Sequence, residues 1–427
     1  MRQFLLSIAL TTALLTGVAA GDQLTATTLD GQTFLGELRE WSAENVTLLT
    51  ENGQKQISTA GLMSLRWSPA SKPAEVQLPI IELTDGSVLP IDGYSQRGNI
   101  AIASLRGAVP SKEKQKSLPI ARIQAIRLQA LNANLQQQWD EIRTQDLPSD
   151  VLVVLRRDGQ SIDYVEGIVG DISVEDVEFK LDGEAMRVDR SKVAGIVFYR
   201  GSTTQVELEN SSIKSSCVVH GRGGLHVVAK RVVLEDAMLH IEMAGDLQLD
   251  WPLADVEYAD FSAGKVAFLS DLVPAVQKWT PLVGLPAGAS IAANYGRPRL
   301  DQSGFGGPLS LLLPASGDSA LVEKEQLFNK GIALRSRTEI SYRLPQGYSR
   351  LLATAGIEPA TDSGGNTKLT IHGDNRQLLE REISGGEAPL EIDLEIAGVR
   401  KLTLVVDYGK NLDTGDWLNL CNARIVK

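Results

Sequence analysis

Short apolar runs separated by Asp-Gly or Asn-Gly turns recur in four segments of the chain, and this recurrence restricts the fold more than any other feature. Both dipeptides favour tight hairpins, because such turns need positive φ angles. We expect each segment to form about five short strands, enough for a small closed barrel. The segments are 23–67, 80–128, 151–199 and a weaker copy at 204–261. Their turns are Asp30-Gly31, Asn52-Gly53, Asp85-Gly86, Asp158-Gly159 and Asp182-Gly183.

One stretch between the second and third segments has helical periodicity instead. Its apolar residues are spaced i, i+4, i+8 and i+11, at Leu131, Leu135, Trp139 and Ile142. This spacing places them on one face of a helix, which Leu147-Pro148 ends. We therefore predict a helix of about four turns that joins two pairs of β units.

The pattern changes again after residue 266. Leu390, Ile392, Leu394 and Ile396 alternate with acidic residues, and a second alternating run covers 402–406. A period of two with one polar face is typical of strands in a β-sandwich. The sequence therefore predicts a sandwich at the C-terminus.

Several landmarks in this region occur in the order typical of one family. They are Trp279-Thr280-Pro281, Tyr295-Gly296-Arg297-Pro298, Gly306-Gly307-Pro308-Leu309, the stretch 330–342 and Ala355-Gly356-Ile357. Residues 266–427 thus resemble the NPCBM family of carbohydrate-binding modules, which occurs in bacterial glycoside hydrolases and other exported proteins. The resemblance implies a galactose-binding-like jelly-roll sandwich that recognises sugars through loops at one end. The N-terminal repeats resemble, less specifically, Sm-like and SH3-like small barrels.

Sugar recognition combines an aromatic face with planar polar groups that bridge hydroxyls. If the loops converge as the resemblance implies, the carbohydrate-binding residues are Trp417, Asn419, Asp407, Arg335 and Arg337. The alternative is structural. Trp417 then fills the end of the core, and the two arginines pair with Glu339 or Asp407.

The sequence contains no recognisable catalytic motif. The four histidines lack the i, i+4 spacing of a zinc site, and no Gly-x-Ser-x-Gly elbow occurs. We therefore predict that the protein is not an enzyme and has no catalytic residues, metal site or cofactor. A two-carboxylate glycosidase remains the minor alternative. Loop residues Asp362, Asn366 and Asp413 offer oxygen ligands for a structural calcium ion.

The N-terminus predicts where the protein acts, and the net charge restricts its partners. Arg2, an apolar run at 4–15 and Val18-Ala19-Ala20 form a secretory signal peptide over residues 1–20. The net charge of −11 disfavours nucleic acid as a partner. We expect an exported protein, periplasmic or at the cell surface, without a membrane span after cleavage. Cys217 and Cys421 are expected to be buried thiols rather than a disulfide.

These observations predict an all-β chain. Its parts are a signal peptide at 1–20, two barrel-like units at 21–129, a connecting helix at 130–147, two further β units at 148–262 and the sandwich at 266–427. The predicted function is non-catalytic binding of a polysaccharide or surface glycan through the sandwich. The alternative is a cell-envelope scaffold that binds other proteins and has lost sugar binding.

Overall fold

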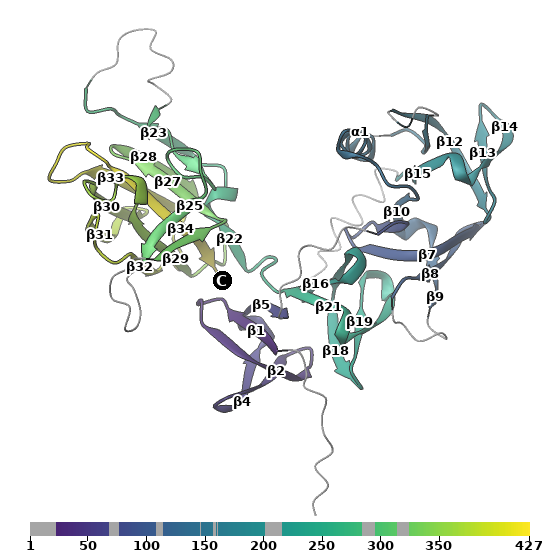
Figure 1. Ribbon diagram of the computed structural model, residues 1–427, viewed down its shortest axis with the longest axis horizontal. Coiled ribbons are helices and arrows are strands. Elements are labelled where there is room, and N and C mark those ends of the chain that lie inside the picture. The colour runs from purple at the N-terminus through teal and green to yellow at the C-terminus, as the bar shows by residue number, and fades with distance from the viewer. Residues whose placement is uncertain are drawn as a thin grey trace, which may run out of the picture. The chain divides into compact units, whose positions relative to one another are not determined.

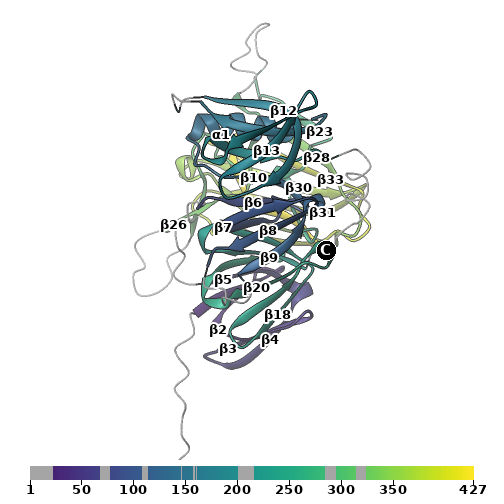
Figure 2. The same cartoon turned by 90° about the vertical axis from the view of Figure 1, so that its right-hand side faces the viewer.

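The computed structural model describes residues 23–67, 77–107, 114–145, 147–156, 159, 161–200, 216–283, 295–313 and 324–427 (Figures 1 and 2). The predicted signal peptide lies outside these residues. The chain divides into two compact units, Met1–Phe261 (unit 1) and Ser262–Lys427 (unit 2). Strands dominate both units, and the described residues contain one α-helix, which confirms the all-β prediction.

Unit 1 contains four repeats, three of five strands and a fourth of six. Repeat 1 consists of β1 (Gln23–Thr28), β2 (Thr33–Trp41), β3 (Asn45–Thr50), β4 (Gly53–Ser58) and β5 (Leu62–Trp67). Repeat 2 consists of β6 (Ile80–Leu83), β7 (Val88–Arg97), β8 (Ile100–Leu105), β9 (Gln115–Pro119) and β10 (Ile123–Arg127). Repeat 3 consists of β11 (Asp150–Leu155), β12 (Ile162–Ile172), β13 (Asp176–Leu181), β14 (Glu184–Asp189) and β15 (Val193–Val197). Repeat 4 consists of β16 (Cys217–Gly221), β17 (Leu225–Ala229), β18 (Arg231–Glu235), β19 (Met238–Glu242), β20 (Gln248–Pro252) and β21 (Val256–Asp260).

In each repeat the first strand pairs antiparallel with the second and with the last, and a 3₁₀ turn precedes the last strand. The turn glycines have positive φ, as expected for hairpins, for example 89° at Gly31 and 87° at Gly86. The residue before the glycine has positive φ only at Asp182 among the described turns. Glycine alone therefore provides the unusual conformation in the other turns.

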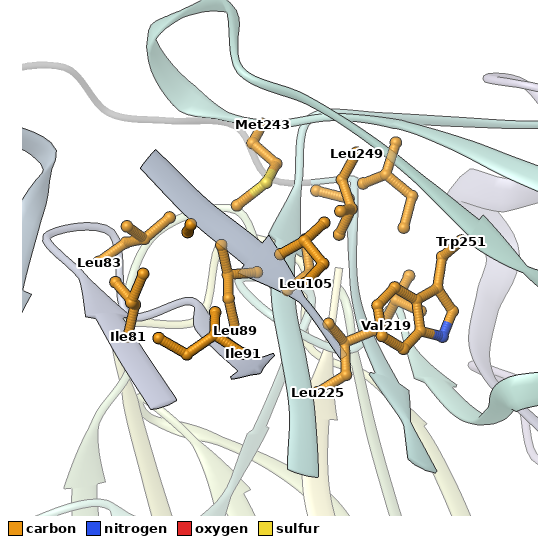
Figure 3. Close-up of a cluster of buried hydrophobic side chains, with 14 of the residues drawn as sticks. Ile81, Leu83, Leu89, Ile91, Leu105, Val219, Leu225, Met243, Leu249 and Trp251 are labelled. Carbon is orange, nitrogen blue, oxygen red and sulfur yellow. The ribbon is translucent and has the colours of Figure 1, made fainter. Parts of the chain in front are cut away.

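The repeats pair through their last strands in a nested order. β10 pairs with β15, which joins repeats 2 and 3, and β5 pairs with β21, which joins repeats 1 and 4. The last strands therefore pair repeat 2 with repeat 3, which the helix separates in sequence, and repeat 1 with repeat 4, rather than repeat 1 with repeat 2 and repeat 3 with repeat 4. Buried side chains from all four repeats form one apolar cluster. Figure 3 shows part of it, where Leu89 and Leu105 of repeat 2 lie near Val219 and Trp251 of repeat 4.

The predicted helix is α1 (Ala133–Thr144), and the Asn132 side chain caps its N-terminus by accepting a hydrogen bond from the Leu135 amide. Leu135, Trp139 and Ile142 are buried, in agreement with the predicted apolar face. They pack on strands of repeats 2 and 3, and the indole of Trp139 lies against Gly195 of β15. The helix is thus an integral part of the fold of unit 1.

Unit 2, coloured green to yellow in Figure 1, is a sandwich of two antiparallel sheets. The β34 sheet contains, in order, β24 (Arg299–Leu300), β27 (Gly331–Arg335), β34 (Trp417–Val426), β29 (Arg350–Ile357) and β32 (Leu390–Glu395), and β22 (Val266–Phe268) also pairs with β34. The β33 sheet contains β23 (Val276–Trp279), β28 (Thr338–Arg343), β33 (Lys401–Tyr408), β30 (Asn366–Gly373) and β31 (Arg376–Ser384). The predicted alternation is confirmed, because Ile392, Leu402 and Leu404 face the core between the sheets.

A hairpin covers the outer face of the β34 sheet. It consists of β25 (Leu309–Leu313) and β26 (Lys324–Phe328). Successive side chains of a strand point to opposite faces, so β34 sends Leu418 and Leu420 into the sandwich core and Trp417 and Cys421 toward the hairpin. Both faces of β34 are therefore covered, which explains why nearly all of its residues are buried.

Both cysteines are buried thiols, as expected. Among the described residues, no helix has the length and apolarity that a membrane span requires.

Candidate functional site

Four of the five predicted binding residues lie at one end of the sandwich because of the strand registers. Arg335 ends β27 and is opposite Trp417 at the start of β34. The next strand, β28, begins at Thr338 opposite Val406 of β33. Arg337 in the short connection and Asp407 near the end of β33 therefore lie at the same end.

Trp417 is fully buried, with an exposed fraction of 0%. It packs with Leu309, Leu311 and Phe328 of the covering hairpin. An added Cβ atom at Gly304 would come within 2.4 Å of the indole, so the loop after β24 is also in close contact with it. In this structure the ring has no face open to a sugar, and it supports the residues above it.

Two aromatic rings that the sequence analysis did not select lie over Trp417. The ring centroids of Tyr295 and Phe305 are each 6.3 Å from that of Trp417. Tyr295 is 50% exposed and Phe305 is 56% exposed. We call Tyr295, Phe305 and Trp417 the aromatic cluster. A signal for Phe305 was present in the sequence, because a large apolar residue between Gly304 and Gly306-Gly307 lies in a turn rather than in a core strand.

Arg335 joins the aromatic cluster to a polar rim. Its guanidinium carbon lies 4.8 Å from the Tyr295 ring centroid and 5.9 Å from that of Trp417, within range of cation–π attraction. The guanidinium donates a hydrogen bond of 3.2 Å to the Asp413 backbone oxygen and lies 3.5 Å from the Asp413 carboxylate. Exposed rings, a guanidinium and a carboxylate are thus adjacent, which is the combination that sugar rings and hydroxyls require.

Arg337 and Asp407 form a separate, more exposed ion pair at 3.6 Å. This agrees with the structural alternative for Arg337. Asp407 also accepts a hydrogen bond from the Tyr408 amide. The pair lies at the same end of the sandwich as Arg335, but the structure shows no contact between it and the aromatic cluster among the described residues.

Asn419 is fully buried and faces the interior on the hairpin side. Its amide group donates to the Ser310 backbone oxygen at 3.0 Å and to the Glu358 carboxylate at 2.8 Å. Glu358 also accepts hydrogen bonds from Ser303 and from the Gly304 amide, although burial still raises its pKa. Asn419 is therefore not available to a ligand, and with Glu358 it fixes the loop that carries Phe305.

The three loop residues considered for calcium are used in hydrogen bonds. Asp362 accepts from the Gly386 amide, and Asn366 accepts from the Lys410 amide and donates to Ser384. Asp413 contacts Arg335. Within the described ranges, no group of three or more His, Cys, Asp or Glu side chains is arranged to hold a metal ion.

Three solved structures with low overall similarity contain carbohydrate-binding modules. The first contains the CBM51-2 and INT domains of Clostridium perfringens ZmpB in complex with GlcNAc. It has 18% identity and a TM-score of 0.32, and the match covers 46% of this chain and 37% of that chain. A CBM51 of Clostridium perfringens GH95 in complex with methyl-galactose has 19% identity, a TM-score of 0.31 and coverage of 38% and 99%. Tandem CBM51 modules of Sp3GH98 from Streptococcus pneumoniae SP3-BS71 have 12% identity, a TM-score of 0.31 and coverage of 82% and 88%. The chain thus spans little more than a third of the length of the first of these structures.

A search of curated proteins gave no match. The family model of the NPCBM/NEW2 domain matches residues 284–426, a range that includes Tyr295, Phe305, Arg335 and Trp417. This match confirms the resemblance predicted from the sequence, and the part of unit 2 that carries the aromatic cluster is similar to NPCBM/NEW2 domains.

Proposed function

We propose that this chain binds a polysaccharide or surface glycan, without catalysis, through the aromatic cluster of unit 2. One observation carries the proposal: Tyr295 and Phe305 are half exposed on a buried tryptophan, beside Arg335 and Asp413. Exposed apolar side chains that lie together, rather than scattered singly, often mark a binding site. The match of this region to a carbohydrate-binding family supports the same interpretation.

In the proposed complex, Tyr295 and Phe305 contact the apolar face of a sugar ring. Arg335 and Asp413 then bind neighbouring hydroxyls as donor and acceptor. Each hydroxyl exchanges water contacts for protein contacts, with a net gain of only about 1 kcal/mol. The expected dissociation constant therefore lies in the range from about 1 μM to about 1 mM.

Glycan-array screening of the full chain, followed by titration with the best glycan, tests this proposal. Tyr295→Ala and Phe305→Ala should each weaken binding about tenfold, which corresponds to roughly 1.4 kcal/mol. Thermal unfolding should change little, because both rings are already half exposed. Tyr199→Ala in unit 1 is the matched control, since Tyr199 is also exposed and should not affect affinity.

If no glycan on the array binds, the proposal fails and the scaffold interpretation is favoured. If a glycan binds equally well to all three variants, the site lies elsewhere. Release of reducing sugar by the purified chain would contradict the absence of catalysis.

Export is part of the proposal. The protein is expected to lose residues 1–20 and to act in the periplasm or at the cell surface. Mass spectrometry of the protein from its native source should show an N-terminus near Gly21. An intact Met1 on cytoplasmic protein would contradict export.

A further inference from the structure

Unit 1 contains a cavity of 730 Å³ that the glycan-binding proposal does not use. Strands β6 and β7 of repeat 2, strand β10, helix α1, and strands β16, β17 and β21 of repeat 4 contribute to its walls. Cavities that bind small molecules are typically about 300–1,000 Å³ in volume. The size of this one is therefore sufficient for an organic ligand.

Two histidines form one wall of the cavity. His220 and His226 are direct neighbours on β16 and β17, and their ring centroids are 4.8 Å apart. The row continues on β21, where the Tyr258 ring lies 5.4 Å from His220. Burial lowers the pKa of both histidines, so both imidazoles are neutral at pH 7. Each neutral ring offers one donor nitrogen, one acceptor nitrogen and an apolar face.

Charged side chains of both signs also line the cavity, and most of them interact with one another. They are Glu82, Asp140, Glu257, Arg127 and Arg143. Arg143 of α1 lies 2.6 Å from the Glu82 carboxylate and 3.8 Å from that of Asp140. Arg127 donates to the Gln136 side chain, which in turn donates to Asp140 at 3.1 Å. An incoming anion would meet these carboxylates, and an incoming cation would meet the two guanidinium groups.

Two residues that line the cavity each have a buried polar atom without a hydrogen-bond partner in the described part of the chain. These atoms are the Thr84 hydroxyl oxygen and Nε of Arg127. A buried polar atom without a partner is destabilising, and a ligand that offers donors and acceptors removes that cost. The rest of the lining includes the aliphatic side chains Ile80, Val88 and Leu225.

We infer that this cavity binds a neutral, hydroxyl-rich ligand with the dimensions of a short oligosaccharide. Neutral imidazoles, an unpaired hydroxyl and an unpaired guanidinium NH match hydroxyl groups, and the aliphatic side chains match the apolar face of a sugar ring. An apolar ligand would leave the polar atoms unsatisfied. The cavity is a second site, separate from the aromatic cluster, and it does not depend on glycan binding by unit 2.

Histidine NMR provides a direct test on the full chain, which contains only four histidines. The Cε1–H signals are followed during titration with maltotetraose, cellotetraose and chitotetraose, each to roughly 10 mM, a range suited to weak binding. At least one of these probes should shift the signals of His220 and His226. His240, which pairs with Asp250, and His372 on β30 lie outside the cavity and serve as internal controls.

Variants separate this site from the aromatic cluster. Thr84→Val keeps the shape of the side chain but removes the hydroxyl, and it should weaken binding about tenfold, as expected for the loss of one hydrogen bond. Thr47→Val on strand β3, which does not line the cavity, is the control and should have no effect. Tyr295→Ala and Phe305→Ala should leave the shifts of His220 and His226 unchanged, even if they abolish glycan binding by unit 2.

Charged probes test the class of ligand. If tri-galacturonate or a glucosamine trimer shifts His220 and His226 and the neutral probes do not, the inferred ligand class is wrong. If none of the probes shifts these two signals, the cavity does not bind such ligands and the inference is overturned.

Discussion

Trp139 in unit 1 and Trp417 in unit 2 are alike in burial and in their packing against a glycine. Both are fully buried, and each indole lies against a glycine where an added Cβ atom would come within 2.4 Å, at Gly195 and Gly304 respectively. Both indole nitrogens lack a hydrogen-bond partner in the described part of the chain. Burial and packing alone therefore do not distinguish a purely structural tryptophan from one that supports a binding site.

The neighbours distinguish them. Trp139 is surrounded by aliphatic side chains such as Leu135, Ile142 and Val153, all of them buried. Trp417 instead supports two half-exposed rings and lies within cation–π range of Arg335. The two half-exposed rings and Arg335, rather than the burial of the indole, are therefore what set the surroundings of Trp417 apart.

The largest expected effect comes from removing either indole. Trp139→Ala and Trp417→Ala should each lower the free energy of unfolding by about 3–5 kcal/mol, because a large cavity remains in a packed core. Calorimetry of the full chain should detect both losses. Only Trp417→Ala should also weaken glycan binding when measured well below its unfolding temperature, because Tyr295 and Phe305 lose their support.

Trp417→Phe is the control for this comparison, since it keeps a ring in the same place with a smaller loss of stability. Weakened binding without any destabilisation in Trp417→Ala would mean that the indole contacts sugar directly. Weakened binding in Trp139→Ala would remove the distinction between the two tryptophans.

Substitution of the two glycines that contact these indoles should change stability by a smaller amount. Gly195→Ala should cost about 1–3 kcal/mol, because the new methyl group meets both Trp139 and the Ile126 backbone oxygen inside a central sheet. Gly304→Ala should cost less, since the clash involves only a side chain and the loop can shift. That shift moves Phe305, so affinity for glycan should fall more than stability.

Gly61→Ala and Gly307→Ala are matched controls in units 1 and 2, because an added methyl group there meets nothing within 4 Å. Equal destabilisation by Gly195→Ala and Gly304→Ala would show that the loop after β24 is as rigid as the sheet. Unchanged affinity in Gly304→Ala would contradict the role of this loop in positioning Phe305.

Local sequence patterns were sufficient to predict much of the fold. The alternation around Ile392 predicted a sandwich strand, and the spacing of Leu135, Trp139 and Ile142 predicted the helix, because each pattern reflects one element facing one core. The nested pairing of β5 with β21 and of β10 with β15 was not predictable in this way. It depends on contacts between strands far apart in sequence, for which a single strand carries no signal.

The site was predicted less completely, for a related reason. Trp417 and Asn419 follow the pattern of an exposed face of β34, but the hairpin 309–328 covers that face and buries both. The sequence of β34 itself carries no signal that a hairpin covers this face. The structure places Arg335 beside Trp417, whereas the position of Phe305 over the tryptophan depends on a loop that folds back over the sheet.

The smallest expected effect is a difference in how stability depends on pH in the two units. In unit 1, burial lowers the pKa of His220 and His226. The unfolded chain then binds protons first as the pH falls below about 6.5, so the stability contributed by these groups decreases toward acid pH. In unit 2, burial raises the pKa of Glu358 and Asp416, so the folded form retains protons that the unfolded chain has released above about pH 4.

The stability contributed by Glu358 and Asp416 therefore decreases as the pH rises through their raised pKa values. The stability contributed by the two histidines decreases as the pH falls. Other groups also titrate, so the comparison requires variants. Calorimetry between pH 4 and pH 7 should show that His220→Gln reduces the acid-side loss of stability of unit 1. Glu358→Gln should reduce the stability that unit 2 loses as the pH rises toward 7, because a neutral amide has no charge to bury. If both substitutions change the pH dependence in the same direction, the two units do not differ in the way that their buried groups indicate.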